Sequence, residues 1–493
     1  MPRIRRWLVV VCLCPAGAAV AQESWPGFAR NAQHSSLTPA SAQNLNRIRW
    51  QTPVDLAPQY SSSGELLIHY GSPLVTAGNT VIVPVKTGAA GGFRVDARRA
   101  ADGVLKWSQT TDYILPAHQW TPIFGPTIAP FRVYFPGAGG TVYYQDDPDL
   151  DNGDHGQIAF YGLANYQANA PLYNANVLID TPITADSEGN LYFGFLVLGP
   201  TPAALASGIA RISASGAGSW APVTGVSGDP TMLQVAGNCA PALSVDGSTL
   251  YFAVSNGSSG YLVAVDSKTL APVARVALKD PKSGNPALIT NNSSASPTVG
   301  PDGDVYYGVL ENPSLENIDR GWLLHFDGKL SQSKTTGAFG WDDTPSVVPA
   351  GMVAAYRGKS SYLLMTKYNN YADTGGTGAN KIAILDPNAT ETDPVTGMPV
   401  MQEVLTVEGV TPNPPLTGVK EWCIDSAAVD YATDSVLAGS EDGKLYRWNL
   451  ATNTLSQSIV LTPGIGEAYT PTVVGPDGTI YAINDATLFA VGQ

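Results

Sequence analysis

The sequence predicts an all-β protein: an eight-bladed β-propeller of four-stranded antiparallel blades, with the ring closed by an N-terminal strand. Three observations predict this class. Charged residues are only 14% of the 493 residues, while Gly (51) and Pro (38) are abundant, which is typical of short strands joined by tight turns. A short phrase recurs along the chain. Asp-Gly turns follow several of its copies.

The recurring phrase is a small residue, then Pro or Ala, then an apolar strand. We call its second residue the anchor. Neighbouring anchors lie 44 to 82 residues apart, which is the range expected for propeller blades with one long insertion. The eight anchors are Pro73, Pro126, Pro182, Pro241, Pro297, Pro345, Ala427 and Pro471.

A hairpin follows most anchors. Asp302-Gly303 and Asp477-Gly478 supply the positive φ that a two-residue hairpin turn needs, and each precedes a strand that carries a Tyr. A third strand and a fourth strand complete each unit. Because one such sheet cannot bury both of its faces alone, stacking eight of them around an axis is the expected solution.

The last unit holds only three strands before Gln493. We expect its outer strand to come from Arg47–Thr52, within a closing segment at 45–56, so that the start of the domain pairs with its end. Residues 22–44 then form an N-terminal segment ahead of the closing strand, and a single propeller occupies 22–493.

Residues 1–21 read as an export signal. Three arginines precede a short apolar run, and Ala19-Val20-Ala21 has the pattern of a cleavage site. The apolar run is too short to span a bilayer. We therefore expect a periplasmic or secreted protein. Its net charge of −14 disfavours nucleic acid or an anionic membrane surface as a partner.

Two cysteines, Cys239 and Cys423, follow the predicted cleavage site. In an oxidising compartment they could form a disulfide. Two separate buried thiols are the alternative, and the sequence spacing does not decide between them.

Two phrases resemble a known family. Val95-Asp96-Ala97 followed by Asp102–Trp107 resembles the tryptophan-docking motif of pyrroloquinoline-quinone-type propellers, and Trp25–His34 resembles the segment that precedes such propellers. The resemblance implies an eight-bladed fold. The family includes calcium- and quinone-dependent alcohol dehydrogenases and a non-catalytic lipoprotein of the outer-membrane barrel-assembly machinery. The enzymes hold the quinone against adjacent paired cysteines, which this sequence lacks, and that argues against pyrroloquinoline quinone as a cofactor.

Residues just before each innermost strand should line one mouth of the central channel. Asp180, Asp343 and Asp425 all stand two residues before an anchor, so symmetry would bring them toward one axis. Such convergence is a binding-site pattern, although an Asp there could equally fix the local turn. The candidate catalytic residues are Asp343, Asp425 and His69, and the candidate cofactor-binding residues are Trp341, Trp422, Asp180 and Glu467.

An acidic loop provides a separate candidate metal site. Asp147, Asp149, Asp151 and Asp154 offer the oxygen ligands that calcium prefers. Their spacing is not that of an EF-hand, and a solvated acidic hairpin is the alternative interpretation. The sequence thus establishes no cofactor: calcium is possible, and pyrroloquinoline quinone is disfavoured.

These observations favour a binding or scaffold module whose partner is an envelope protein or an extracellular carbohydrate. The alternative is an enzyme with its site at the channel mouth, either a calcium- and quinone-dependent oxidoreductase or a cofactor-free lyase or hydrolase. The sequence contains no G-x-S-x-G, H-E-x-x-H or P-loop motif.

Overall fold

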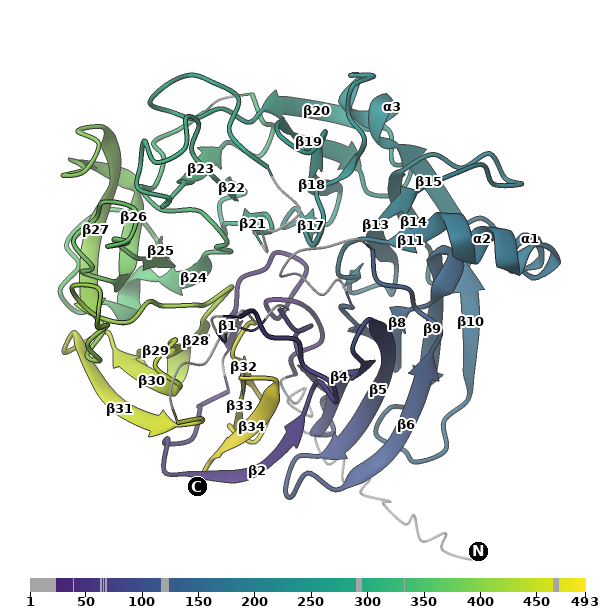
Figure 1. Ribbon diagram of the computed structural model, residues 1–493, viewed down its shortest axis with the longest axis horizontal. Helices are drawn as coiled ribbons and strands as arrows, with labels where there is room; N and C mark the ends of the chain where they lie inside the picture. Colours follow the sequence, from purple (N-terminus) through teal and green to yellow (C-terminus); the bar gives the residue numbers. More distant parts are fainter. Residues whose placement is uncertain are drawn as a thin grey trace, which may run out of the picture.

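The computed structural model describes residues 24–38, 40–62, 64, 66, 69–116, 124–289, 295–331, 333–463 and 470–493. Eight sheets surround a central axis, each with its innermost strand at the channel and its outermost strand at the rim (Figure 1). The predicted fold class is therefore confirmed. The predicted export signal at 1–21 lies outside the described residues. In the described ranges no helix has both the length and the apolar character needed to cross a membrane.

The first four blades follow the chain in order, from the innermost strand outward. Their strands are β3 (Leu74–Val75), β4 (Thr80–Gly88), β5 (Gly91–Arg99) and β6 (Leu105–Thr111); β7 (Thr127–Ala129), β8 (Arg132–Pro136), β9 (Thr141–Asp146) and β10 (His155–Ala159); β12 (Thr184–Ala185), β13 (Leu191–Val197), β14 (Gly208–Ile212) and β15 (Gly218–Pro222); and β17 (Ala242–Leu243), β18 (Thr249–Ser255), β19 (Gly260–Asp266) and β20 (Pro272–Ala277). Short strands β11 (Val177–Ile179) and β16 (Gln234–Val235) extend blades 3 and 4.

The last four blades continue the ring. Their strands are β21 (Thr298–Val299), β22 (Val305–Val309) and β23 (Trp322–Phe326); β24 (Ser346–Pro349), β25 (Tyr362–Tyr368), β26 (Lys381–Thr392) and β27 (Pro399–Glu408); β28 (Ala428–Asp430), β29 (Ser435–Gly439), β30 (Lys444–Asn449) and β31 (Thr454–Val460); and β32 (Val473–Val474), β33 (Ile480–Asn484), β34 (Thr487–Gly492) and β2 (Arg47–Pro53).

Two details differ from the sequence prediction. Blade 5 has three strands in the described part of the chain, because the segment after β23 makes only isolated bridges. Short helices, which the apolar pattern did not indicate, occupy connections on the outside of blades 2 to 4. They are α1 (Leu163–Ala168), α2 (Ala170–Asn176) and α3 (Val223–Ser227), with 3-10 turns at Ala138–Gly140, Ala350–Met352 and Tyr431–Thr433.

The ring closes as predicted. Strand β2 pairs antiparallel with β34, from Arg47 opposite Gly492 to Pro53 opposite Thr487. Trp50 of β2 then docks on blade 1, where its Nε1 donates a hydrogen bond of 2.8 Å to the Ala100 carbonyl. Its ring covers Gly103, whose φ is +72° and at which a Cβ atom would fall 2.7 Å from the indole. Glycine is required at 103 on both counts.

The predicted tryptophan-docking phrase makes the equivalent contact between blades 1 and 2. Trp107 lies on the outer strand β6, and its Nε1 donates to the Pro148 carbonyl of the next blade at 3.0 Å. Lys106 reaches the same loop through its Nζ, which donates to the Asp149 carbonyl at 2.5 Å. Outer-strand tryptophans thus join neighbouring blades at two places in the ring.

The N-terminal segment follows the channel wall at the end where the first hairpin turns of the blades lie (Figure 1). Six innermost strands donate a backbone N–H to it, in each case from the second residue after the anchor. The donors Val75, Ile128, Leu243, Val299, Val347 and Val429 reach the carbonyls of Trp25, Pro26, Ala32, Gln33, Ser35 and Ser36 over 2.6 to 3.0 Å. Strand β1 (Leu37–Thr38) then runs parallel to β28.

Removing the closing indole should open the ring. We expect Trp50→Ala to lower the free energy of unfolding by about 3 to 5 kcal/mol, the usual cost of deleting a buried tryptophan side chain. Denaturant unfolding followed by tryptophan fluorescence and circular dichroism measures it. Val460→Ala, at an exposed site on β31, is the matched control. Equal stability of the two variants would contradict the role assigned to Trp50.

The N-terminal segment should make stability depend on pH. Burial lowers the pKa of His34 to about 4, although its hydrogen bond to the Pro297 carbonyl opposes the shift. Because the unfolded chain takes up this proton near pH 6.5 and the folded protein does not, the unfolding free energy must fall as the pH drops from about 6.5 to about 4. His34→Gln should remove on the order of 3 kcal/mol of that fall.

The measurement is a series of unfolding curves between pH 4 and 8. His155→Gln, which changes an exposed histidine, serves as the control and should follow the wild type. If the unfolding free energy of His34→Gln changed with pH in parallel with that of the wild type, His34 would not be held neutral in the folded protein.

Candidate functional site

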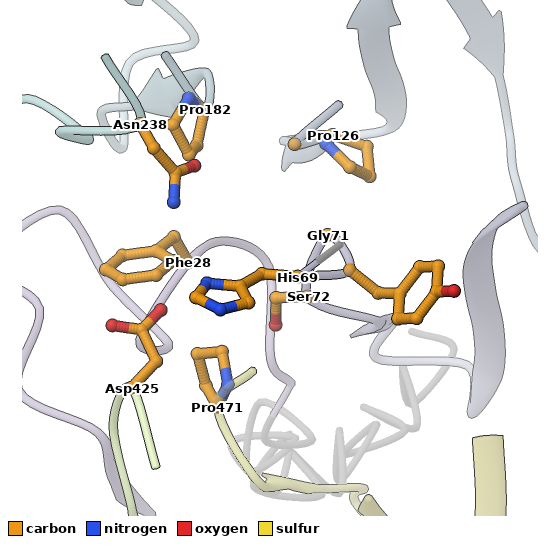
Figure 2. A pocket seen from close by; sticks show the side chains of 11 residues that line it. Phe28, His69, Gly71, Ser72, Pro126, Pro182, Asn238, Asp425 and Pro471 are labelled. Carbon is orange, nitrogen blue, oxygen red and sulfur yellow. The ribbon is translucent and has the colours of Figure 1, made fainter. Parts of the chain in front are cut away.

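A small cavity lies inside the channel, on the mouth side of the N-terminal segment. Its volume is about 20 Å³, room for one water molecule. Figure 2 shows the Asn238 amide and the Asp425 carboxylate directed toward His69 and the ring of Phe28. Gly71, Pro126 and other residues at or near the anchors complete the wall. Two predicted catalytic residues, His69 and Asp425, therefore share one cavity.

His69 is a neutral imidazole. Burial lowers its pKa well below the usual value, and the positive charge of Lys367 lowers it further. Lys367, at the end of β25, is itself 2% exposed. A neutral histidine can accept a proton, so His69 has the protonation state that a general base needs.

Asp180 and Asp343 are buried carboxyl groups, each 1% exposed. Burial raises the pKa of both well above the usual value. Within the described residues, neither oxygen of Asp180 and only one oxygen of Asp343 has a hydrogen-bond partner. Burial therefore disfavours the ionised form of both side chains, which is the form that binds a cation.

The remaining predicted cofactor residues are dispersed. Trp422 is fully buried: its Nε1 donates to the Asn380 carbonyl at 3.3 Å and its ring packs against Tyr446. Trp341 is partly exposed, and its backbone N–H donates to the Arg320 carbonyl. Glu467 lies outside the described residues. Cys239 and Cys423 are both buried and neither is in a disulfide, so the alternative of two separate thiols holds.

The acidic loop after β9 is held against blade 1. The Asp149 carboxylate accepts a hydrogen bond of 2.5 Å from Thr76 Oγ1, while Asp151 and Asp154 are exposed. Asp147 has a positive φ of 45°. In the part of the chain that the structure describes, the ligand atoms of Asp147, Asp149, Asp151 and Asp154 do not form a group compact enough for one metal ion.

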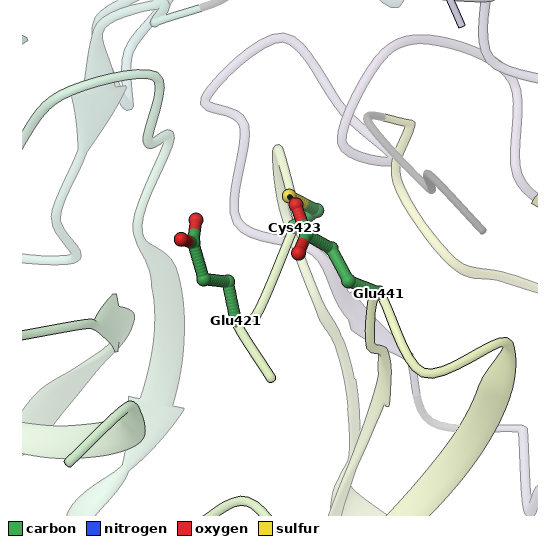
Figure 3. A group of neighbouring side chains, drawn as sticks. All are labelled: Glu421, Cys423 and Glu441. Carbon is green, nitrogen blue, oxygen red and sulfur yellow. Dashed lines mark hydrogen bonds between the residues drawn. The ribbon is translucent and has the colours of Figure 1, made fainter. Parts of the chain in front are cut away.

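One compact group of metal-ligating side chains does occur among the described residues. The ligand atoms of Glu421, Cys423 and Glu441 all lie within 4.8 Å of one another. Figure 3 shows Glu421 and Cys423 on one segment and Glu441 approaching from the loop after β29. The Cys423 thiol donates a hydrogen bond of 2.8 Å to Glu441. A divalent cation here would have to displace that proton.

Burial and neighbouring negative charges favour the protonated form of Glu421 in this group. Burial raises the pKa of Glu421 to about 8, and the negative charges of Glu441 and Asp373 contribute to the shift. Burial raises the pKa of the Cys423 thiol as well. Burial thus favours the protonated forms of the Glu421 carboxyl and the Cys423 thiol in this group.

Sequence reasoning missed Lys367, Glu421 and Glu441. A lone lysine within the apolar stretch Tyr362–Tyr368 was the available signal for Lys367, because an unpaired charge there is costly. Glu421 sits beside Trp422 and Cys423, which were singled out. Glu441 stands directly before the turn after β29, and nothing in the local sequence marks it.

The described channel residues do not fit a quinone cofactor. An aromatic cofactor of that size needs a cavity of several hundred cubic ångströms, whereas the described cavity is about 20 Å³. The indole of Trp422 is buried in the protein core and presents no face for stacking. In the described residues, Asp180, Asp343 and Asp425 do not come within metal-coordination distance as a group.

Comparison with solved structures places the fold among quinoprotein propellers. A europium-containing methanol dehydrogenase matches with a TM-score of 0.57 and 10% identity, covering 94% of this chain and 89% of that one. A quinohemoprotein alcohol dehydrogenase from Comamonas testosteroni gives 0.54 and 12%, covering 97% and 82%. BamB from Moraxella catarrhalis gives 0.44 and 11%, covering 90% and 98%.

No family model and no curated protein matches the sequence. The resemblance to quinoprotein alcohol dehydrogenases that the sequence suggested is confirmed for the fold. Identities of 10 to 12% carry no residue roles to this chain.

The Glu421 group predicts a second pH dependence with the opposite sign. The folded protein keeps the Glu421 proton up to about pH 8, whereas the unfolded chain loses it near pH 4.5. The unfolding free energy must therefore fall as the pH rises between these values. Glu421→Gln should remove this fall and stabilise the protein at pH 8 by an amount on the order of a few kcal/mol.

Unfolding curves at pH 5, 6.5 and 8 measure this effect. Glu408→Gln, an exposed change on β27, is the control. If Glu421→Gln destabilised the protein equally at all three pH values, the side chain would be a hydrogen-bonded anion and the assignment would be wrong.

Proposed function

We propose that the protein is an exported binding module that holds an extended segment of an envelope protein in a groove at the N-terminal-segment end of the propeller. One observation carries the proposal: a groove of about 850 Å³ lies between the N-terminal segment and the first hairpin turns of blades 1 to 4. Its size is within the range of ligand-binding clefts.

Exposed apolar side chains line this groove. Phe131, Leu150 and Val245 are 78%, 54% and 59% exposed. Each stands in a turn, where solvent would normally favour a polar residue, and together they make an apolar surface on one face. Exposed apolar surface of this kind marks interaction sites in soluble proteins.

The charged groups that line the groove are all acidic. They are Asp147, Asp149, Asp186 and Asp246, and no lysine or arginine is among the described lining residues. Hydrogen bonds from Ser244 and Ser248 lower the pKa of Asp246 to about 2, so it is ionised. A partner segment with alternating apolar and basic side chains complements this surface.

Carbohydrate is the less suitable partner. Sugar rings are usually held by stacking on several aromatic side chains, and Phe131 is the one aromatic residue among the described lining residues. A polypeptide with apolar side chains makes fuller use of Leu150 and Val245.

A defined peptide tests the proposal. A ten-residue peptide of alternating Leu and Lys should bind in fluorescence anisotropy, more weakly as salt rises, while its Leu/Glu counterpart should not. Phe131→Ala should weaken binding about tenfold, and Asp147→Asn should reduce the salt dependence. Leu198→Ala, at an equally exposed site elsewhere, is the matched control.

Three outcomes would overturn the proposal: equal binding of the Leu/Lys and Leu/Glu peptides, no effect of Phe131→Ala, or binding of a β-glucan hexasaccharide in place of the peptide. The last outcome would favour the carbohydrate alternative.

A second candidate function is supported by the shared cavity of His69 and Asp425. Because the cavity holds about one water molecule, a substrate would bind at the channel mouth beside it, and the neutral His69 would act as general base toward that water in a cofactor-free lyase or hydrolase. Turnover of a chromogenic ester or glycoside that disappears in both His69→Gln and Asp425→Asn would favour this function. Turnover that survives both changes would count against it.

A further inference from the structure

The rim of blade 5 lacks the regular outer strand that its neighbours have. The described residues that follow β23 form two isolated bridges with it, Leu323 with Gly337 and Phe326 with Ser333, and no regular strand. In Figure 1, loops occupy the rim outside β23, whereas β20 of blade 4 is a full outer strand. This leaves a cavity of about 440 Å³ between β20 and β23.

The wall of this cavity is apolar. Val276 and Ala277 come from β20, Leu324 and Phe326 come from β23, and Pro281 closes one end. Leu324 and Phe326 are buried, while Val276 is half-buried. An apolar molecule placed here would remove the remaining exposed surface of Val276 and Ala277 from water and would contact the buried Leu324 and Phe326.

The charged side chains at the cavity are basic. Lys279 and Lys334 are exposed and line it, and no carboxylate is among its described lining residues. Lys334 forms an ion pair with Asp304, which also accepts a hydrogen bond of 2.9 Å from His325 Nε2. Lys279 forms no ion pair among the described residues, so its charge is available to a ligand.

We propose that this cavity binds a small amphipathic anion, with its anionic group at Lys279 and its apolar body against Val276, Leu324 and Phe326. A volume of about 440 Å³ accommodates a molecule of the size of a medium-chain fatty acid. The site is separate from the groove proposed above and does not depend on that function. The net charge of the chain is −14, so attraction of an anion to this cavity would come from the local charge of Lys279.

A peptide strand is not the ligand, because backbone groups on the outer edge of β23 already have hydrogen-bond partners. The Leu323 N–H donates to the Gly337 carbonyl at 3.1 Å, and the Lys334 N–H donates to the His325 carbonyl at 2.8 Å. These backbone bonds occupy the groups to which an added strand would pair. A small molecule needs none of them.

The test uses 8-anilinonaphthalene-1-sulfonate, a fluorescent amphipathic anion, with the folded protein at pH 7. We expect saturable binding at one site and displacement by dodecanoate. Dodecanol and dodecyltrimethylammonium should displace it at least about fivefold more weakly, the effect of losing one ion pair.

Two variants locate the site. Lys279→Gln should raise the dissociation constant about fivefold, and Ala277→Trp should fill the cavity and abolish binding. Lys359→Gln, an exposed lysine in the loop before β25, is the control and should leave binding unchanged. Thermal unfolding of each variant confirms that it is folded.

Unchanged affinity in Lys279→Gln would overturn the proposal, as would displacement by dodecanol as strong as that by dodecanoate. If Ala277→Trp fails to fold, Lys279→Gln and the displacement series still decide the question. Failure of this test leaves the groove function untouched, because the two sites share no residue.

Discussion

Unpaired backbone at the inner edge of each blade is the constraint that the rest of the structure accommodates. Apart from β28, which also pairs with β1, each innermost strand in the described chain has a neighbouring strand on its outer side only, and a buried N–H without a partner is costly. The N-terminal segment supplies carbonyls to six of these strands at equivalent positions. It can do so only by taking unusual backbone conformations, with positive φ at Ala29, Arg30, His34 and Ser36. The segment is therefore part of the fold rather than a tail attached to it.

This arrangement makes the two ends of the channel chemically different. At one end the N-terminal segment fills the space and, with the blade turns, forms a groove whose charges are acidic. At the other end the channel mouth gathers the carboxyl groups of Asp343 and Glu421, whose pKa values burial raises, together with the buried Lys367. The two proposed functions correspond to these two ends. Displaced pKa values are common at functional sites but also occur in structural clusters.

The sequence predicted the strands and hairpins of each blade well. It predicted poorly which side chains from distant segments lie close together. The anchors located all eight blades, and the pattern at Arg47–Thr52 identified the closing strand, because hairpin turns and strand alternation are encoded within a few residues. The contact of Trp107 with the next blade was predicted from the tryptophan-docking motif. Glu441 meets Cys423 through the folding of blade 7, and Lys367 of β25 comes near enough to affect His69, ahead of β3, only because the ring closes; no local sequence pattern records either approach. The absence of a regular outer strand in blade 5 was not predicted, because the third strand of this blade has the same kind of sequence pattern as the third strands of the other blades.

The pairing of β2 with β34 also dictates when the ring can form. Arg47 and Gly492 are opposite one another in the last blade, so nearly the whole chain must be present before that sheet can be completed. Contacts this far apart in sequence are slow to form, because a long loop must close before they contribute any stability. Until then, β34 presents an unpaired edge, the kind of surface that promotes association between incomplete chains. Folding of this protein therefore ends, rather than begins, at its N-terminal strand.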